Sequence, residues 1–91
     1  MLPVEWKRGA QADLVAIIDY IADDNPDAAQ ALKDELVATV GKLPQNPQMY
    51  REGRVSGTRE IVVRKNYVVV YSETQSQITI LRVLHAAQEY P

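Results

Sequence analysis

The sequence predicts an α+β fold in which a short N-terminal strand and a helical hairpin pack on one face of a small antiparallel sheet. Three observations predict it. Residues 10–43 carry two helical stripes of apolar side chains, Asn25-Pro26 separates the stripes, and three runs rich in β-branched residues follow residue 57. A chain of 91 residues is long enough for one hydrophobic core and too short for two. We therefore expect a single domain over residues 1–91.

The first elements are a strand and a helix. Residues 2–6 alternate loosely between apolar and polar side chains, and Pro3 suits an edge strand because its missing N–H costs no pairing there. A helix is expected from Ala10 to about Asp24. Its apolar stripe consists of Ala10, Leu14, Ile17, Ile18 and Ile21. The acidic residues between them, which we interpret as a solvated face, are Asp13, Asp19 and Asp23.

The second helix is predicted to begin at the Asn25-Pro26 joint. Asn25 is a favourable N-cap, and Pro26 is tolerated as the first helical residue because its N–H would be unpaired anyway. Asp27 in the first turn suits the helix dipole. The apolar stripe consists of Ala29, Leu32, Leu36, Val40 and Leu43, after which Pro44 ends the helix.

The C-terminal half is predicted to form an antiparallel meander. Residues 44–57 contain two prolines and two glycines without periodicity and are expected to be a loop. The three strands expected after it are 58–64, 67–71 and 77–84, joined by turns at 65–66 and 73–76. No helix is expected on the second face of this sheet. The cationic side chains placed on that face or its rim are Arg59, Arg64 or Lys65, and Arg82.

Composition excludes several classes of protein. The chain has no cysteine and one histidine, so a disulfide framework, a thiolate site and an all-protein zinc site are not expected. No stretch approaches the roughly 18 apolar residues of a membrane span, and the first residues lack a signal-peptide pattern, so we expect a cytoplasmic protein with no membrane partner. The net charge is -2 and divides into -4 for residues 1–50 and +2 for residues 51–91.

Arginines and the histidine are the candidate functional residues. Guanidinium groups bind phosphate and carboxylate in a bidentate manner, which draws attention to Arg59, Arg64 and Arg82. Arg82 lies within an apolar run and needs a counter-charge, either a side chain such as Glu60 or a ligand anion. His85 can transfer a proton near neutral pH, although a structural role is the more common one for a lone histidine. Tyr90 is a weaker candidate, because a phenol needs nearby cations to act as an acid or base.

The tyrosines of the central run and the tryptophan have a simpler interpretation. Tyr67 and Tyr71 are four residues apart and therefore share one face of a strand, where core packing with the hydroxyl at the edge is favoured over base stacking. Trp6 is also expected in the core.

Several motifs in the same order resemble the RelE/ParE superfamily, the toxins of bacterial type II toxin-antitoxin systems. They span nearly the whole chain and consist of Trp6, A-x-x-D-L-x-x-I-x-x-Y-I from Ala10, the Asn25-Pro26 joint, the 43–47 loop with Gly53-Arg54, Gly57-Thr58-Arg59-Glu60, the 67–71 strand, and Ile80 to His85 with Gln88. The resemblance implies a helical hairpin on a small sheet. From the composition we expect no metal, and we expect no cofactor. It also implies that the short N-terminal strand joins this sheet.

The superfamily implies two mechanisms. RelE-like members cleave mRNA in the ribosomal A site, and by that resemblance Arg59, Arg82, His85 and Tyr90 would be the catalytic residues. ParE-like members block DNA gyrase without cleaving RNA. Ribosome-dependent members commonly place an arginine after the first tyrosine of the central strand, where this chain has Tyr67-Val68, and the chain lacks the basic charge suited to ribosomal RNA. These departures favour a ParE-like toxin.

A cognate antitoxin is the partner that the resemblance implies, and operator DNA would be contacted only indirectly, through this antitoxin. The expected contacts with target or antitoxin are Arg54, Arg59, Arg64, Lys65, Arg82 and His85. We expect the antitoxin to lie along the helical hairpin and the sheet edge, because an acidic, apolar segment complements the positive half of the chain. A module that binds its antitoxin without any toxic activity is a third possibility.

Overall fold

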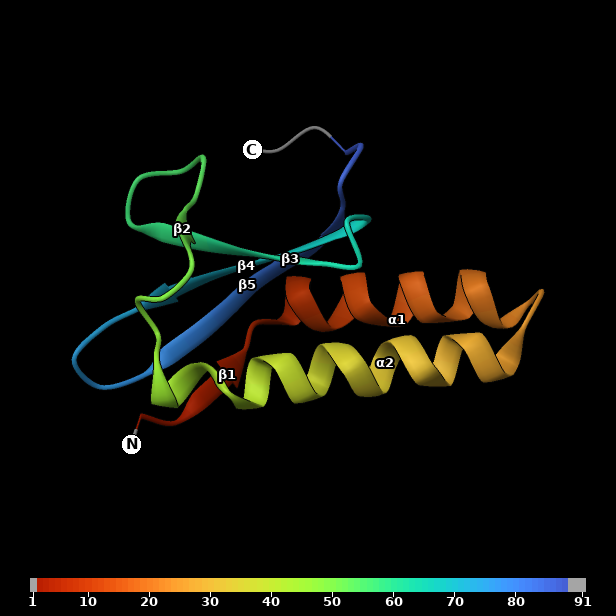
Figure 1. The fold of residues 1–91 in the computed structure, drawn as a ribbon, viewed down its shortest axis with the longest axis horizontal. Helices are drawn as coiled ribbons and strands as arrows, with labels where there is room; N and C mark the ends of the chain where they lie inside the picture. Colours follow the sequence, from red (N-terminus) through yellow and green to blue (C-terminus); the bar gives the residue numbers. More distant parts are fainter. Residues whose placement is uncertain (1, 89–91) are drawn as a thin grey trace.

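The computed structural model, which describes residues 2–88, confirms the α+β class: a five-stranded sheet with two helices on one face (Figure 1). The order of the strands in the sheet is β1-β5-β4-β3-β2. The helices are α1 (Arg8–Ala22) and α2 (Pro26–Gly41), followed by a 3-10 helix, η1 (Leu43–Gln45). The strands are β1 (Val4–Trp6), β2 (Arg51–Glu52), β3 (Thr58–Val63), β4 (Tyr67–Glu73) and β5 (Ile78–His85).

The sheet is mixed because its N-terminal strand runs parallel to its neighbour. β3, β4 and β5 form the predicted antiparallel meander. β1 lies at one edge and pairs in parallel with β5, with Val4 opposite Ile78. β2 lies at the other edge and falls within residues 44–57, which we predicted to be a loop. That prediction was wrong at two places, since η1 also lies there. Both segments are too short to produce a periodic pattern in the sequence.

The helical hairpin forms as its sequence signals predict. The side chain of Asn25 accepts a hydrogen bond from the Ala28 N–H at 3.1 Å, and Pro26 is the first residue of α2. This cap fixes the joint between the helices. α1 begins at Arg8, two residues before the predicted start, and α2 ends at Gly41, so Leu43 belongs to η1.

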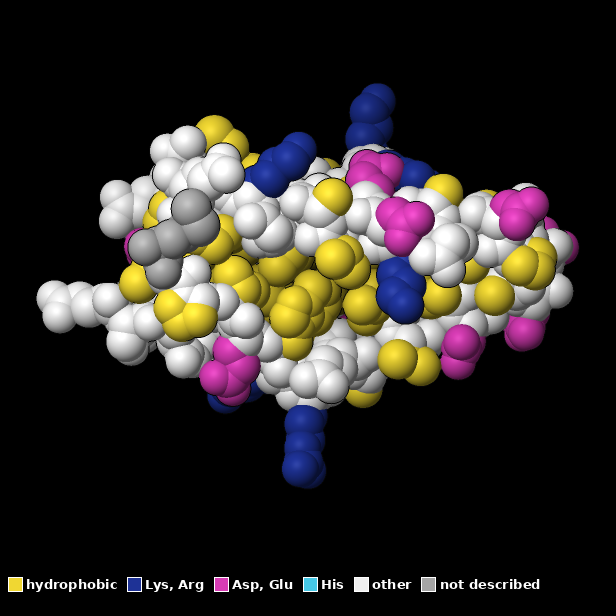
Figure 2. Space-filling view, turned by 90° about the horizontal axis from the view of Figure 1, so that it is seen from below, with side chains coloured by type: hydrophobic (Ala, Val, Ile, Leu, Met, Phe, Trp, Pro, Cys, Tyr) yellow, Lys and Arg dark blue, Asp and Glu magenta, His cyan; other side chains and the backbone are white. Residues whose placement is uncertain are grey.

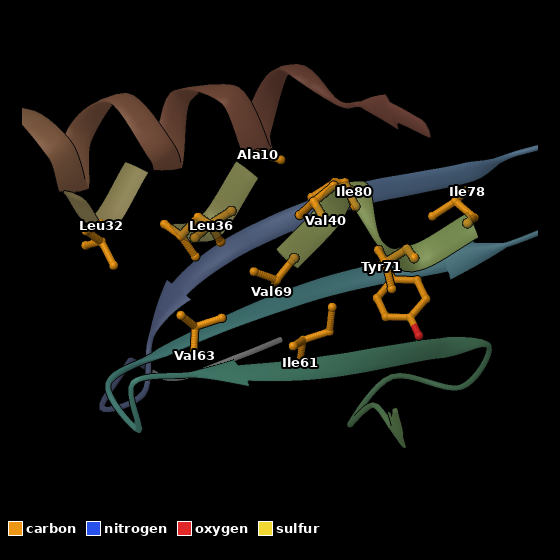
Figure 3. Close-up of a cluster of buried hydrophobic side chains, with 12 residues drawn as sticks. Ala10, Leu32, Leu36, Val40, Ile61, Val63, Val69, Tyr71, Ile78 and Ile80 are labelled. Carbon is orange, nitrogen blue, oxygen red and sulfur yellow. The ribbon is translucent and has the colours of Figure 1, made fainter. Parts of the chain in front are cut away.

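The main core lies between the helices and the sheet (Figure 3). The predicted stripe of α2 is buried in full, whereas in α1 only Ala10 is fully buried. Tyr71 is the largest fully buried side chain, and its hydroxyl donates to the Pro47 carbonyl. Burial raises the pKa of Tyr71 to about 12, which keeps the phenol neutral. Trp6 packs at the margin of the core. Core packing is therefore confirmed for both aromatic residues.

A bulge in β5 changes which way the side chains point. Tyr71 of β4 is opposite Ile80, but the adjacent Val70 is opposite Arg82, so Leu81 has no partner in the register. Ile80 and Val83 therefore both face the helices, and Arg82, opposite Val70, reaches α1 at the β5 edge. Leu81 packs against a second, smaller apolar cluster on the other face of the sheet, made by Val68, Val70 and Leu84.

Candidate functional site

Arg82 is held by α1 at the β5 edge of the sheet. Its Nε and one Nη donate to the two carboxylate oxygens of Asp13 at 2.7 and 3.1 Å. The Val83 N–H donates to the same carboxylate at 2.9 Å. β1 pairs with β5 only as far as Ile80, so Asp13 takes the place of a strand partner beyond that point.

Two predictions about these residues were wrong. Asp13 does not belong to a solvated helix face: its side chain is 18% exposed because α1 lies directly against the β5 edge. Glu60 is not the counter-charge of Arg82, because β4 separates their strands. The helical spacing placed Asp13 off the apolar stripe, but spacing alone does not show that this side of α1 meets a strand edge.

Glu60 instead organises the opposite edge, around β2 and β3. Its carboxylate accepts hydrogen bonds from Arg51 Nη2 at 2.9 Å and from the Arg54 N–H at 3.1 Å, and Arg54 Nε lies 3.6 Å away. Burial raises the pKa of Glu60, but these hydrogen bonds and the two positive charges outweigh burial and hold the pKa below its ordinary value. Arg51 was not among the predicted site residues. No strand was recognisable around Arg51 in the sequence, so its pairing with Glu60 could not be predicted.

Arg59 and Arg64 bind groups on the chain itself. Arg59 Nη1 donates to the Tyr50 carbonyl at 2.7 Å. Arg64 Nε donates to Glu35 of α2 at 2.6 Å, which places this side chain toward the helices and not on the second face of the sheet. Arg64 and Lys65 have φ angles of 54° and 64°, so the β3–β4 turn begins one residue earlier than predicted. Lys65 is exposed in that turn.

His85 ends β5 beside Tyr67, with the ring centroids 5.7 Å apart in an edge-to-face arrangement. The Ala87 N–H donates to His85 Nδ1 at 3.2 Å. A neutral ring whose Nδ1 accepts a hydrogen bond carries its proton on Nε2. The outward nitrogen of His85 is therefore a donor in the neutral ring, and a general base would require the other tautomer.

The four residues proposed for RNA cleavage are not all brought together. Arg59 is opposite Tyr71 and His85 is opposite Tyr67, at different ends of β4. The separation is about 13 Å along the strand and about 10 Å across two strand spacings. Arg82 is three residues from His85, and its side chain is held against α1 by Asp13. Tyr90 lies outside the described residues.

Within residues 2–88 no group of three or more histidine, aspartate or glutamate side chains could hold a metal ion. Neither helix of this region is long and apolar enough to cross a membrane.

The outer surface of the helical layer has an uneven distribution of side chains. Seen from below, hydrophobic side chains gather in the middle of this face, and most acidic side chains lie toward the end where α1 meets α2 (Figure 2). Val15 of α1 and Val37 of α2 are among the exposed large hydrophobic residues. An apolar area of this kind on helices marks an interaction surface more often than an isolated exposed residue does.

Comparison with known proteins identifies the fold and then the family. YafQ from E. coli has a TM-score of 0.69 at 16% identity over 96% of both chains, which shows a shared fold. The chromosomal ParDE TA system from P. aeruginosa contains a chain with a TM-score of 0.83 and 26% identity, over 93% of this chain and 96% of that one. Toxin RelE2 of Caulobacter vibrioides is 36% identical over 88 residues, or 97% of this chain and 99% of the relative.

The protein is thus a toxin of the RelE/ParE superfamily. A family model described as the ParE toxin of the type II toxin-antitoxin system, parDE, matches residues 4–90, and the chain belongs to this family.

Proposed function

We propose that this toxin arrests growth by blocking DNA gyrase through a non-catalytic surface, and that a cognate antitoxin neutralises it. The observation that carries the proposal is the separation of Arg59 from His85. Cleavage of RNA requires a proton-transfer group and cationic groups that converge on one phosphate within hydrogen-bond reach. Groups at different ends of β4 do not converge in this way.

The contacts of the candidate catalytic residues support the same proposal. Arg59 is bound to a backbone carbonyl and Arg82 to Asp13, so groups of the chain itself already hold both side chains. His85 Nδ1 accepts the Ala87 N–H, so a role as general base would require the other tautomer of the ring. The absence of an arginine at Val68 and the net charge of -2 also weigh against binding to ribosomal RNA.

A RelE-like endoribonuclease is the second candidate, and one observation favours it. His85 is exposed and lies beside Tyr67, so an imidazole and a phenol are available at one end of the sheet. In this alternative Arg82, three residues from His85, would be the cation near the phosphate. The ring of His85 would have to adopt the other tautomer.

The antitoxin is proposed to lie along the outer face of the helical hairpin and to reach the sheet edge. The solved ParDE and DinJ-YafQ structures are toxin-antitoxin systems or complexes, which supports a partner of this kind. The exposed Val15 and Val37 offer apolar surface that a partner helix could cover. An antitoxin confined to the acidic tip of the hairpin, residues 23–27, would contradict this arrangement.

Two parallel assays with purified toxin separate the candidates. We expect inhibition of gyrase supercoiling and intact mRNA in a translating ribosome extract, read by primer extension. Cuts in the mRNA that His85→Ala abolishes would establish the endoribonuclease instead. Inactivity in both assays, with the antitoxin still bound, would favour a module that only binds its antitoxin.

A further inference from the structure

Three residues at the β2–β3 edge form a cluster that the proposed mechanism does not use. Glu60 of β3 is 2% exposed, and its carboxylate contacts Arg51 and Arg54 as described above. Glu60 and Val62 are two residues apart on one strand and share the face of the sheet that the helices do not cover. We call Arg51, Arg54, Glu60 and Val62 the edge patch.

The edge patch has an excess of positive charge that faces solvent. Two arginines share one carboxylate, and the side chain of Arg51 is 56% exposed. Arg51 donates a single hydrogen bond to Glu60, through Nη2, whereas a guanidinium has five N–H donors. Because Glu60 is buried and fixed, it holds one side of the guanidinium and leaves the other side available to an external anion.

The loop between the arginines and Glu60 is built to keep this geometry. A Cβ at Gly53 would clash with the Thr58 hydroxyl, and Gly57 has a φ of 83°, which favours glycine. The Gly53 N–H donates to the Thr58 carbonyl at 2.8 Å, and the Thr58 hydroxyl donates to the Val55 carbonyl at 2.6 Å. The loop rises on the side of the sheet that faces away from the helices (Figure 1). Little conformational freedom remains to be lost on binding.

An apolar side chain completes the edge patch. Val62 is exposed, whereas Val68, directly opposite it on β4, is buried. A ligand that places an anionic group at Arg51 can therefore place an apolar side chain at Val62, about 7 Å further along the strand.

We propose that the edge patch is a docking surface for an acidic, extended segment of the antitoxin, with Arg51 as the anion-binding residue and Glu60 as the residue that positions it. This inference rests on the proposed antitoxin partner and adds a second contact area to the helical face. Carboxylates are the anions that fit best. Glu60 already neutralises one of the two arginines, and the single remaining positive charge suits an isolated carboxylate better than the continuous charge of a nucleic acid.

Binding of defined peptides to the intact toxin tests the proposal. The probe is a fluorescent peptide of alternating glutamate and valine, compared with its glutamine-valine counterpart and with an oligouridylate of equal charge. We expect anisotropy to report binding of the acidic peptide only, weakening with added salt. Arg51→Ala should weaken this binding about tenfold, as expected for the loss of one hydrogen bond to a charged group.

Matched variants test separately the charge of Arg51 and the position of its guanidinium group. Arg51→Lys keeps the positive charge but loses the planar guanidinium that Glu60 holds, so it should also weaken binding of the acidic peptide. Arg8→Ala removes an exposed arginine that follows β1, at the opposite edge of the sheet, and it should leave the affinity unchanged. Equal losses for Arg51→Ala and Arg8→Ala, equal binding of the glutamine peptide, or preferential binding of the oligouridylate would each overturn the proposal.

The antitoxin itself provides the final comparison. Arg51→Ala should lower the affinity for the antitoxin about tenfold while inhibition of supercoiling stays at the wild-type level. An unchanged antitoxin affinity would overturn the edge-patch proposal and leave the gyrase proposal standing. Failure of the gyrase proposal is recognised separately, by a wild-type toxin that does not inhibit supercoiling.

Discussion

The two edges of the sheet use the same chemistry over different distances in the chain. At the β5 edge, Asp13 accepts hydrogen bonds from Arg82 and from a backbone N–H, and it is 69 residues from Arg82 in the sequence. At the β3 edge, Glu60 accepts hydrogen bonds from Arg51 and from a backbone N–H, and its partners are nine and six residues away. The first cluster joins the helical layer to the sheet, and the second fixes one loop. The number of residues between the partners, more than the type of contact, should determine how much each cluster stabilises the fold.

The largest effect is expected for Asp13→Ala. The change removes two hydrogen bonds to Arg82 and the acceptor of the Val83 N–H at the junction of α1 and β5. We expect the free energy of unfolding to fall by about 3 kcal/mol, after allowing for the partial exposure of Arg82. Urea denaturation at pH 7 measures this change. Asp19→Ala, an exposed position on the same helix, is the control and should stay within about 0.5 kcal/mol of wild type. Equal midpoints for the two variants would remove the distinction between the edges.

A smaller effect is expected for Glu60→Gln, because its partners are local and can relax with the loop. We expect a loss of about 1.5 kcal/mol at pH 7. The folded-state pKa of Glu60 lies below the ordinary value of 4.5, so its ionised form stabilises the fold above that pH. This stabilisation is lost as the pH falls through the folded-state pKa. Wild type and variant should therefore converge in stability in acid, and unfolding curves that keep a constant difference down to pH 2 would contradict this account.

The smallest effect is expected for Arg64→Ala. Arg64 and Glu35 form one of the shortest ion pairs in the described part of the chain, at 2.6 Å, yet their side chains are 42% and 43% exposed. Solvent screening limits such pairs to about 0.5 kcal/mol. Thermal unfolding of variant and wild type in low and high salt measures the difference. A loss as large as that of Asp13→Ala would mean that the length of an ion pair, not its burial and span, sets its contribution.

The sequence predicted the elements better than the connections between them. The stripe of α2, the Asn25 cap and the three meander strands follow from local periodicity and turn chemistry, and each is present. The parallel direction of β1 could not be predicted from residues 2–6, because a short strand has no feature that distinguishes the two directions. The bulge at Leu81 explains why the alternation of β5 is irregular, but irregular alternation does not locate a bulge.

The sequence predicted which types of residue form the candidate site, but not which residues contact one another. The arginines were identified because guanidinium groups are suited to anions, but their partners depend on tertiary packing. Asp13 and Arg82 meet only because α1 lies on the β5 edge. Arg51 was missed because β2 has only two residues.

The pairing of β1 with β5 joins the first and last strands of the described chain, so it can form only late in synthesis. The first strand and the last strand lie side by side, and Asp13 can bind Arg82 only after β5 has been made. Contacts between distant parts of a chain form slowly, because a long loop must close before they yield any stabilisation. During synthesis the helical hairpin can form early. β1 cannot join the rest of the sheet until β5, which lies between β1 and β4, has been made. A chain that ends before β5 therefore lacks both the β1–β5 pairing and the contact between Asp13 and Arg82.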